Sequence, residues 1–291
     1  MKKREELLLK KNYFPGILFL LPSFIGVSVF VLVPFLDVIR RSFCSAITSQ
    51  FVGIENYKTV FDNTAFRQAV GNSLRFTAIC IPLLLVLSLL LALVIWHFKG
   101  KFLQLKNVYL IPMAIPVASI VVLWKYLFHE EGLLNVILAF FHGKASGWIG
   151  IDWMNTKVSF WVLVFTYIWK NIGYDMILWL AGLASIPKSM YEAAEVDGAG
   201  EWMSFWFITL PNLLPSFFTI MVLSLLNSFK VFREAYLVSG DYPEEHMYLL
   251  QHLFQNWFRN LSLDKLSATA VLVFFFIFIL ILIMKRFMRI Q

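Results

Sequence analysis

Charge, cysteine and clustered histidine are scarce in this sequence, and each shortage excludes a class of protein. Only 15% of the 291 residues are charged, whereas a soluble globular chain carries about 25%. The two cysteines, Cys44 and Cys80, lie far apart and form no CxxC pair, which excludes a disulfide framework. The five histidines are dispersed, and His129 lacks the second histidine of a zinc motif. We therefore expect no metal, no cofactor and no catalytic residue in this chain.

Hydrophobic residues make up 59% of the chain and gather in long runs. A helical span needs about 20 mostly apolar residues to cross about 30 Å of hydrocarbon. The runs are too apolar for the short alternating segments of a strand barrel, so helices are the remaining solution in lipid. The sequence predicts an all-α polytopic membrane protein with six transmembrane helices, and no repeat or second soluble domain. The predicted spans are 14–36, 74–96, 108–128, 160–184, 214–231 and 268–284.

Lysine and arginine gather at both ends of the chain and in the loop after the second span. Positive residues mark cytoplasmic loops, so both termini and this loop are predicted to be cytoplasmic. The first span lacks a small-residue cleavage site and is interpreted as retained. Arg40 and Arg41, in an opposite loop, fit this orientation poorly. The net charge of +7 suits anionic lipid head groups and requires no nucleic acid. The cytoplasmic set is Lys2, Lys3, Arg4, Lys10, Lys11, Lys99, Lys101, Lys106, Lys285, Arg286 and Arg289.

A charged segment, EAAEVDGAGEWMSFWFITLP at 192–211, separates the fourth and fifth spans. Ser189 and Glu192 have the spacing of a capping box, which predicts a helix over 190–196. Gly198 is placed for a left-handed stop. Isolated helices shorter than about 12–15 residues are marginal in water, so this helix needs a docking partner or a purely local role. Both interpretations stay open on physical grounds. Residues 201–214 space Trp202, Trp206 and other apolar residues as an amphipathic helix at the membrane surface.

The same segment resembles the integral membrane subunits of binding-protein-dependent ABC importers. Their pattern is EAA, three residues, Gly, nine residues, Ile, one residue, Leu-Pro. The chain matches every fixed position, and nearby stretches look like the carbohydrate-uptake branch, the maltose and glycerol-3-phosphate type. The resemblance implies that this loop is a coupling helix seated in a cytoplasmic ATPase subunit. The ATPase-coupling residues it implies are Glu192, Ala193, Ala194, Gly198, Ile208, Leu210 and Pro211.

The resemblance also implies a division of the chain and a set of partners. Residues 1–68 are expected to hold the N-terminal tail, the first span and an outer loop. Residues 69–287 are expected to form the importer transmembrane domain, with the EAA loop at 188–212, and 288–291 the C-terminal tail. The implied partners are a second, distinct permease subunit in a heterodimer, an ATPase dimer and an extracytoplasmic solute-binding protein in a prokaryotic cell membrane. No GxxxxGK[ST] phosphate loop occurs in the sequence, so ATP hydrolysis is assigned to another polypeptide.

Polar residues inside the fourth and fifth predicted spans are candidates for a substrate path, because polar groups at membrane depth usually face a cavity or a partner. The predicted path residues are Asn171, Tyr174, Asp175, Asn227 and Lys230. Asn171 and Asp175 share a helix face and could instead join helices. In the fifth span, Leu223, Asn227, Lys230 and Glu234 lie on one stripe, and Lys230 and Glu234 could form an intrahelical pair.

Further expectations concern single residues, one loop segment and the alternative function. Lys170 faces Asp175 poorly across a helix turn. A contact between Lys170 and a partner subunit is therefore expected as readily as a Lys170–Asp175 pair. Trp124 is favoured as an interfacial belt residue over a cavity wall. His246 and His252 are interpreted as solvated loop residues. The segment 239–246 departs from the Gly-Gly-Pro turn of related permeases, and we expect it to face the binding protein. The alternative function, a secondary transporter of a polar solute, predicts internal repeats, and none is evident.

Overall fold

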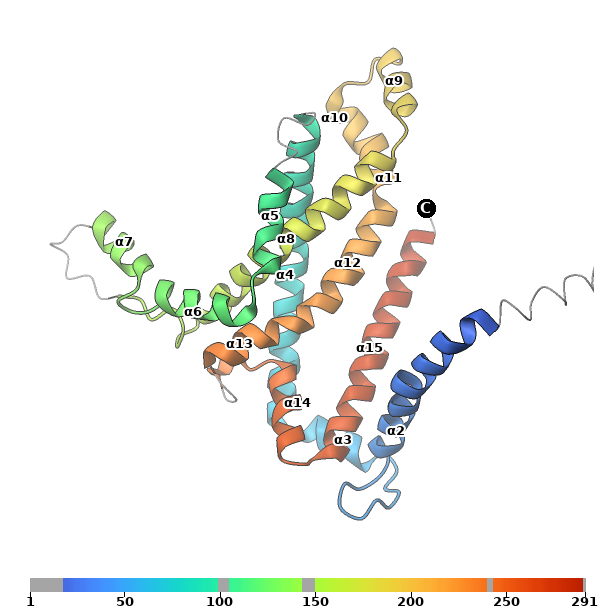
Figure 1. Cartoon of the computed structure of the whole chain (residues 1–291), viewed down its shortest axis with the longest axis vertical. Helices are drawn as coiled ribbons and strands as arrows, with labels where there is room; N and C mark the ends of the chain where they lie inside the picture. Colours follow the sequence, from blue (N-terminus) through green and yellow to red (C-terminus); the bar gives the residue numbers. More distant parts are fainter. Residues whose placement is uncertain (1–17, 99–104, 143–149, 240–242, 290–291) are drawn as a thin grey trace, which may run out of the picture. The chain divides into compact units, whose positions relative to one another are not determined.

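The computed structural model describes residues 18–98, 105–142, 150–239 and 243–289 (Figure 1). Regular structure in these ranges is helical, apart from a single β-bridge between Cys44 and Phe51. This confirms the all-helical class. The N-terminal tail and part of the 239–246 segment lie outside the described residues.

Among the residues that the structure describes, four helices are long and apolar enough to cross a membrane, and a bent pair would make a fifth. The four are Leu18–Ser42, Thr64–His97, Leu214–Tyr236 and Leu263–Arg286. Helix α8 (Ser159–Ser185) is long enough but is not among them, because Lys170, Asn171 and Asp175 lower its mean hydropathy. The predicted count of six spans is therefore not reached by length and composition.

The predicted third span, 108–128, is broken into two helices in the structure. Two helices occupy this region, α5 (Leu105–Ala114) and α6 (Val117–Leu127), and residues 107–114 and 117–127 are bent by 95°. Pro116 lies at the break with an extended ψ of 139°. Proline has no N–H to donate and disfavours a helical residue before it, so the helix ends there and a new one begins.

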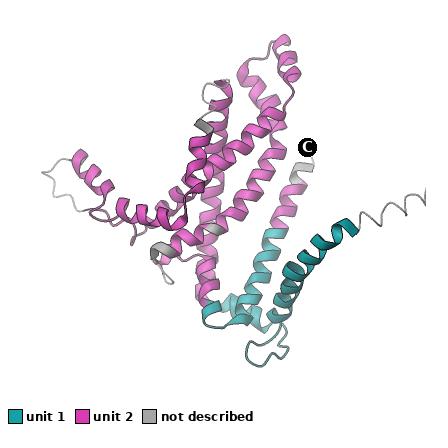
Figure 2. Cartoon of the chain, viewed as in Figure 1, with its two compact units in different colours: residues 1–63, 257–278 teal, residues 64–256, 279–291 magenta. Residues whose placement is uncertain are grey.

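The chain divides into two compact units (Figure 2). Unit 1 comprises residues 1–63 and 257–278, and unit 2 comprises residues 64–256 and 279–291. Unit 1 contains η1 (Ser28–Leu32), α2 (Val33–Ser42) and α3 (Glu55–Asp62). It also contains the end of α14 (Leu250–Arg259) and most of α15 (Leu263–Arg289).

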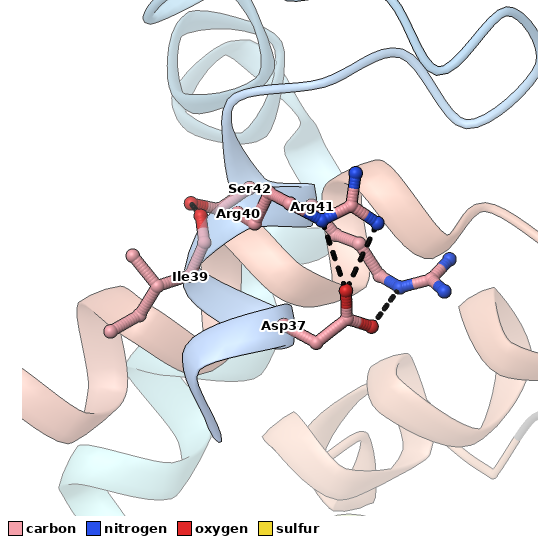
Figure 3. A network of polar contacts seen from close by, with 5 residues as sticks. All are labelled: Asp37, Ile39, Arg40, Arg41 and Ser42. Carbon is pink, nitrogen blue, oxygen red and sulfur yellow. Dashed lines mark hydrogen bonds and ion pairs between the residues drawn. The ribbon is translucent and has the colours of Figure 1, made fainter. Parts of the chain in front are cut away.

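Within unit 1, the two arginines that fit the orientation rule poorly pair with an acidic side chain. Asp37 accepts hydrogen bonds from Arg40 Nε at 3.1 Å and Arg41 Nε at 2.6 Å (Figure 3). The carboxylate offsets part of the charge of the two guanidinium groups. The orientation rule counts lysine and arginine and gives acidic residues little weight, so the poor fit of Arg40 and Arg41 to it remains.

Unit 2 is built around α8, which packs against α4 (Thr64–His97), α5 and α12 (Leu214–Ser228). Its buried core includes Phe76, Leu84 and Tyr167. Two glycines allow close approach to α8. A Cβ on Gly173 would lie 1.9 Å from the Tyr109 carbonyl oxygen, and one on Gly182 would lie 2.3 Å from Ser216 Oγ.

The remaining elements of unit 2 are short. They are α7 (Leu133–His142), α9 (Lys188–Val196), α10 (Glu201–Ser204), η2 (Phe205–Thr209), α11 (Leu210–Asn212), η3 (Phe229–Val231), α13 (Phe232–Ser239) and η4 (Glu245–Met247). Helix α9 projects beyond the ends of α8 and α12, and α13 lies beside α6 (Figure 1).

Candidate functional sites

The helix α9 begins at a proline rather than at the predicted capping box. Pro187 is the N-cap residue, with φ −61° and ψ 132°, and its carbonyl accepts from the Met190 amide at 3.1 Å. Ser189 lies inside the first turn, and no side chain caps the helix. The Ser189–Glu192 capping box is therefore wrong, because the extended backbone that an N-cap requires occurs two residues earlier.

The end of α9 follows the sequence prediction. Gly198 has a φ of +80°, which favours glycine, and its amide donates to the Glu195 carbonyl at 3.1 Å. The next amide, of Ala199, donates to the Ala194 carbonyl at 2.8 Å. These two bonds form a Schellman motif, which satisfies the last carbonyls of the helix. The predicted left-handed stop is confirmed.

Helix α9 packs little against the rest of the chain. None of its nine residues is buried, and Glu192 and Ala193 are exposed. One side-chain bond links it to the following segment, between Tyr191 Oη and Thr209 Oγ1 at 2.9 Å. Thr209 is buried, so this bond attaches α9 to the packed start of the fifth helical region. A short helix that satisfies its last carbonyls but buries none of its residues leaves its surface available to a partner.

The segment after α9 is not the single helix that was predicted for 201–214. It is divided into α10, the π-helical turn η2 and α11, and Leu213 separates these from α12. Pro211 cannot donate to the Phe207 carbonyl, and the Leu210 amide instead donates to the Phe205 carbonyl one residue further back. Trp202 and Trp206 are exposed, as the surface-helix prediction requires. Ile208 and Leu210 are half-buried and Pro211 is exposed.

A second candidate site is a polar cavity of about 120 Å³ in unit 2. Helix α8 supplies Lys170 and Asn171 to its wall, α12 supplies Asn227 and α13 supplies Glu234. The complete lining is Met113, Thr166, Tyr167, Lys170, Asn171, Asn227, Val231 and Glu234. Amide and charged groups that surround a cavity within an apolar bundle can hydrogen-bond a polar solute.

The structure brings together two of the five predicted path residues. Asn171 and Asn227 line the cavity, whereas Tyr174 and Asp175 are not in its lining. The backbone of Lys230 lies in η3, and its side chain is outside the described part of the chain. The short η3 turn interrupts the predicted 223–234 stripe, but Asn227 and Glu234 still line one cavity.

Asp175 takes the helix-joining role that was the alternative to a place in the path. Its carboxylate accepts from Ser224 Oγ of α12 at 2.7 Å, and only 1% of Asp175 is exposed. Tyr167 donates to the Ser224 carbonyl at 2.6 Å, so both residues tie α8 to α12. Sequence reasoning missed Ser224. A serine one turn before Asn227 in an apolar helix is the signal that could have found it.

Lys170 pairs with a residue that was not anticipated. Its Nζ lies 2.5 Å from Glu234 Oε1, and the Glu234 side chain is 5% exposed. The pair joins α8 to α13 across the cavity wall. Glu234, which the sequence also allowed as an intrahelical partner of Lys230, is therefore paired with Lys170.

Two aromatic residues are also placed differently from the sequence prediction. Trp124 is 5% exposed and packs against Phe128 and Trp169, so the belt interpretation is wrong and it lines a small cavity instead. His252 is fully buried, and its Nδ1 accepts from the Leu249 amide at 3.1 Å. The solvated interpretation of His252 is therefore wrong, because the ring packs against Phe232 and Tyr248. His246 is half-buried.

The long apolar helices define a multi-pass membrane protein, and its two candidate sites are the exposed helix α9 and the cavity beside α8. The profile of the family "binding-protein-dependent transport system inner membrane component" matches residues 76–291. The chain belongs to this family. It is therefore an inner-membrane permease subunit of a binding-protein-dependent ABC importer and a transport subunit rather than an enzyme. This membership decides against the secondary-transporter interpretation.

Relatives agree over most of the chain. The sulfoquinovosyl glycerol transport system permease protein SmoG of Agrobacterium fabrum is 31% identical and covers 94% of this chain and 90% of its own length. The sn-glycerol-3-phosphate transport system permease protein UgpA of Escherichia coli is 32% identical, and the match covers 78% of this chain and 76% of UgpA. A crystal structure of a bacterial ABC transporter involved in the import of alginate matches with a TM-score of 0.82 at 21% identity, over 98% of both chains. At this level of sequence identity, the similarity to the alginate transporter shows a shared fold only.

Proposed function

We propose that this chain is one of two permease subunits of an importer that takes up a carbohydrate or a polyol derivative. The observation that carries the proposal is α9, a capped helix with no buried residue in a family whose members work with an ATPase. Glu192, Ala193, Ala194 and Gly198 form the part of α9 and its stop that docks on that ATPase. Ile208, Leu210 and Pro211 anchor the following segment.

The proposed assembly contains this chain, a distinct permease partner, two ATPase subunits and an extracytoplasmic binding protein. Residues 69–287 form the transmembrane domain, with the EAA loop at 188–212. Helix α8 serves as one membrane span and the bent α5–α6 pair as another, which gives six spans. Both termini then lie in the cytoplasm, which agrees with the lysine and arginine distribution.

The proposed substrate class rests on two supports. Relatives carry names of transport systems for sulfoquinovosyl glycerol, starch degradation products and sn-glycerol-3-phosphate. The cavity beside α8 is lined by amides and by a paired cation and anion, which can hydrogen-bond hydroxyl groups from several directions. Asn171 and Asn227 are the path residues proposed at the cavity, and Lys230 is also proposed as a path residue. Tyr174 and Asp175 are proposed to support its wall.

The test is a pair of aspartate substitutions in one loop. Gly198→Asp places a side chain at a φ of +80°, whereas Gly200→Asp adds the same charge at a φ of −73°. Neither added Cβ meets an atom within 4 Å. In vesicles that contain the whole importer, we expect Gly198→Asp to reduce co-purification of the ATPase and ATP-driven uptake at least tenfold, and Gly200→Asp to retain most of both. Normal assembly and uptake by Gly198→Asp would show that α9 is not the docking element.

A further inference from the structure

An ion pair lies beside the middle of helix α8, where charged side chains are costly. Lys170 is near the centre of the helix, and its Nζ is 2.5 Å from Glu234 Oε1 of α13. Both residues line the cavity of about 120 Å³ that was assigned to the solute path. Ionisable groups at membrane depth are rare, and those that occur usually serve a function. The pair is therefore a candidate for more than the joining of two helices.

The two charged side chains differ in their burial. The side chain of Glu234 is 5% accessible, whereas that of Lys170 is 20% accessible. The ammonium donates one hydrogen bond to Oε1, and a lysine ammonium has three donors. The pair therefore does not exhaust the capacity of Lys170 to donate to a solute in the cavity.

The pair sets the charge that a solute in the cavity meets. In a medium of low dielectric constant, the attraction between opposite charges is several times stronger than in water. An anion would be drawn to Lys170, but Glu234 already holds that position. To take it, the anion would have to leave the buried carboxylate without its partner, which is strongly unfavourable. A neutral hydroxyl group accepts from the ammonium and leaves the pair intact.

The amide side chains in the cavity wall suit the same class of solute. Asn171 commits one of its side-chain N–H groups to the Tyr167 carbonyl at 2.8 Å, and an amide also has a second N–H and a carbonyl oxygen. Asn227 places a second amide in the wall. Because amides both donate and accept without carrying charge, they match hydroxyl groups rather than ions.

We propose that Glu234 is a specificity-determining residue of the solute path. It neutralises Lys170, so that the cavity takes uncharged hydroxylated solutes and rejects anionic solutes of the same size. The inference rests on the proposed function and narrows its substrate class to the uncharged members. Removal of the carboxylate alone should therefore turn the cavity into an anion site. A purely structural role of the pair, in joining α8 to α13, would give no such gain.

The first experiment is independent of the natural solute. Bromide serves as a simple anion, and anomalous scattering locates it in crystals of the assembled importer. We expect bromide beside Lys170 Nζ in Glu234→Gln and none there in the wild type. Bromide beside Lys170 in the wild type, or its absence in Glu234→Gln, would overturn the inference.

The second experiment measures the charge preference with three labelled probes of similar size. They are maltotriitol, which is neutral, maltotrionate, which is anionic, and 1-amino-1-deoxymaltotriitol, which is cationic. Equilibrium dialysis is carried out on the permease–ATPase complex in lipid nanodiscs. The binding protein is omitted, so that its own selectivity does not enter. We expect the wild type to bind the neutral probe about tenfold more tightly than the anionic one.

The variants separate the two charges. Glu234→Gln should bind the anionic probe about tenfold more tightly than the wild type does, with little change for the neutral probe. Lys170→Gln leaves the carboxylate unpaired and should favour the cationic probe by a similar factor. The double variant should again prefer the neutral probe, because burial of an unpaired charge is unfavourable. Glu131→Gln, in an exposed turn, is the matched control and should behave as the wild type.

Two results of the binding experiment would overturn the inference. One is a gain in anion binding that persists in the double variant, because Lys170 would then not be the charge involved. The other is a wild type that binds the anionic probe as tightly as the neutral one, a result that depends on no variant being folded. The wild-type comparison includes the charge of Lys230, whose side chain lies outside the described residues. If the wild type binds none of the three probes, the proposed carbohydrate class is contradicted, and the bromide experiment still decides the role of Glu234.

Discussion

At the residue scale, Gly173 marks a tight contact between α5 and α8. A Cβ at position 173 would meet the Tyr109 carbonyl oxygen at 1.9 Å, so α5 and α8 could not keep their present distance. We expect Gly173→Ala to destabilise the purified importer by about 2–3 kcal/mol, the range for overpacking of a tight contact. Thermal denaturation of the detergent-solubilised complex measures this.

The matched control is Gly71→Ala in α4, where an added Cβ meets no atom within 4 Å. Alanine in place of glycine inside a helix gains about 0.5–1 kcal/mol, so this variant should melt at the same or a higher temperature. Equal melting temperatures for the two variants would mean that the α5–α8 contact tolerates a methyl group.

Asn135 offers a second prediction at this scale. It is 3% exposed, and its Nδ2 donates to the carbonyls of Glu130 at 2.9 Å and Ile151 at 2.8 Å. Its Oδ1 accepts from the Ile151 amide and from Trp153 Nε1, both at 3.1 Å. Asn135→Asp keeps the shape and loses the donors beside these carbonyls. We expect a loss of about 2–3 kcal/mol and faster hydrogen exchange at the Ile151 amide, while Asn260→Asp, in an exposed turn, changes neither.

At the element scale, the attachment of α9 depends on one side-chain hydrogen bond. Tyr191→Phe removes the bond to Thr209 and keeps the ring, so α9 should remain folded but become less firmly placed. We expect ATP-driven uptake to fall severalfold while the ATPase still co-purifies. The exposed Tyr126→Phe is the control. Undiminished uptake by Tyr191→Phe would mean that this hydrogen bond does not place the helix.

The elements also show what a sequence can and cannot predict. Hydropathy located the apolar helices because apolar length is a local property. The capping-box prediction failed because Pro187 and Ser189 are both suited to the start of a helix by local rules. In the structure the helix begins directly after Pro187. The bend at Pro116 was missed because the region had enough apolar residues to be taken as one straight span. Lys170 and Glu234 are 64 positions apart, so their pairing depends on the packing of α8 against the α12–α13 region and leaves no periodic signal.

At the scale of the whole molecule, the number of spans decides on which side the termini lie. If α8 and the α5–α6 pair both cross the membrane, six crossings return the C-terminus to the cytoplasm. A green fluorescent protein fused after Gln291 should then be fluorescent, and alkaline phosphatase at the same place should be inactive. The reverse pair of results would place the C-terminus outside the cytoplasm and contradict this topology. A fusion in the loop near Lys99 and Lys101 should behave like the C-terminal one.

The isolation of α9 has a consequence for how such importers can be re-engineered and how they diverge. Nine residues that bury no side chain contribute little to the folding of their own subunit, so they can change almost independently of it. Helix α9 is bounded by Pro187 at its start and by Gly198 at its end. Exchange of residues 188–196 for those of another permease should therefore direct the subunit to that permease's ATPase and leave the solute path unchanged.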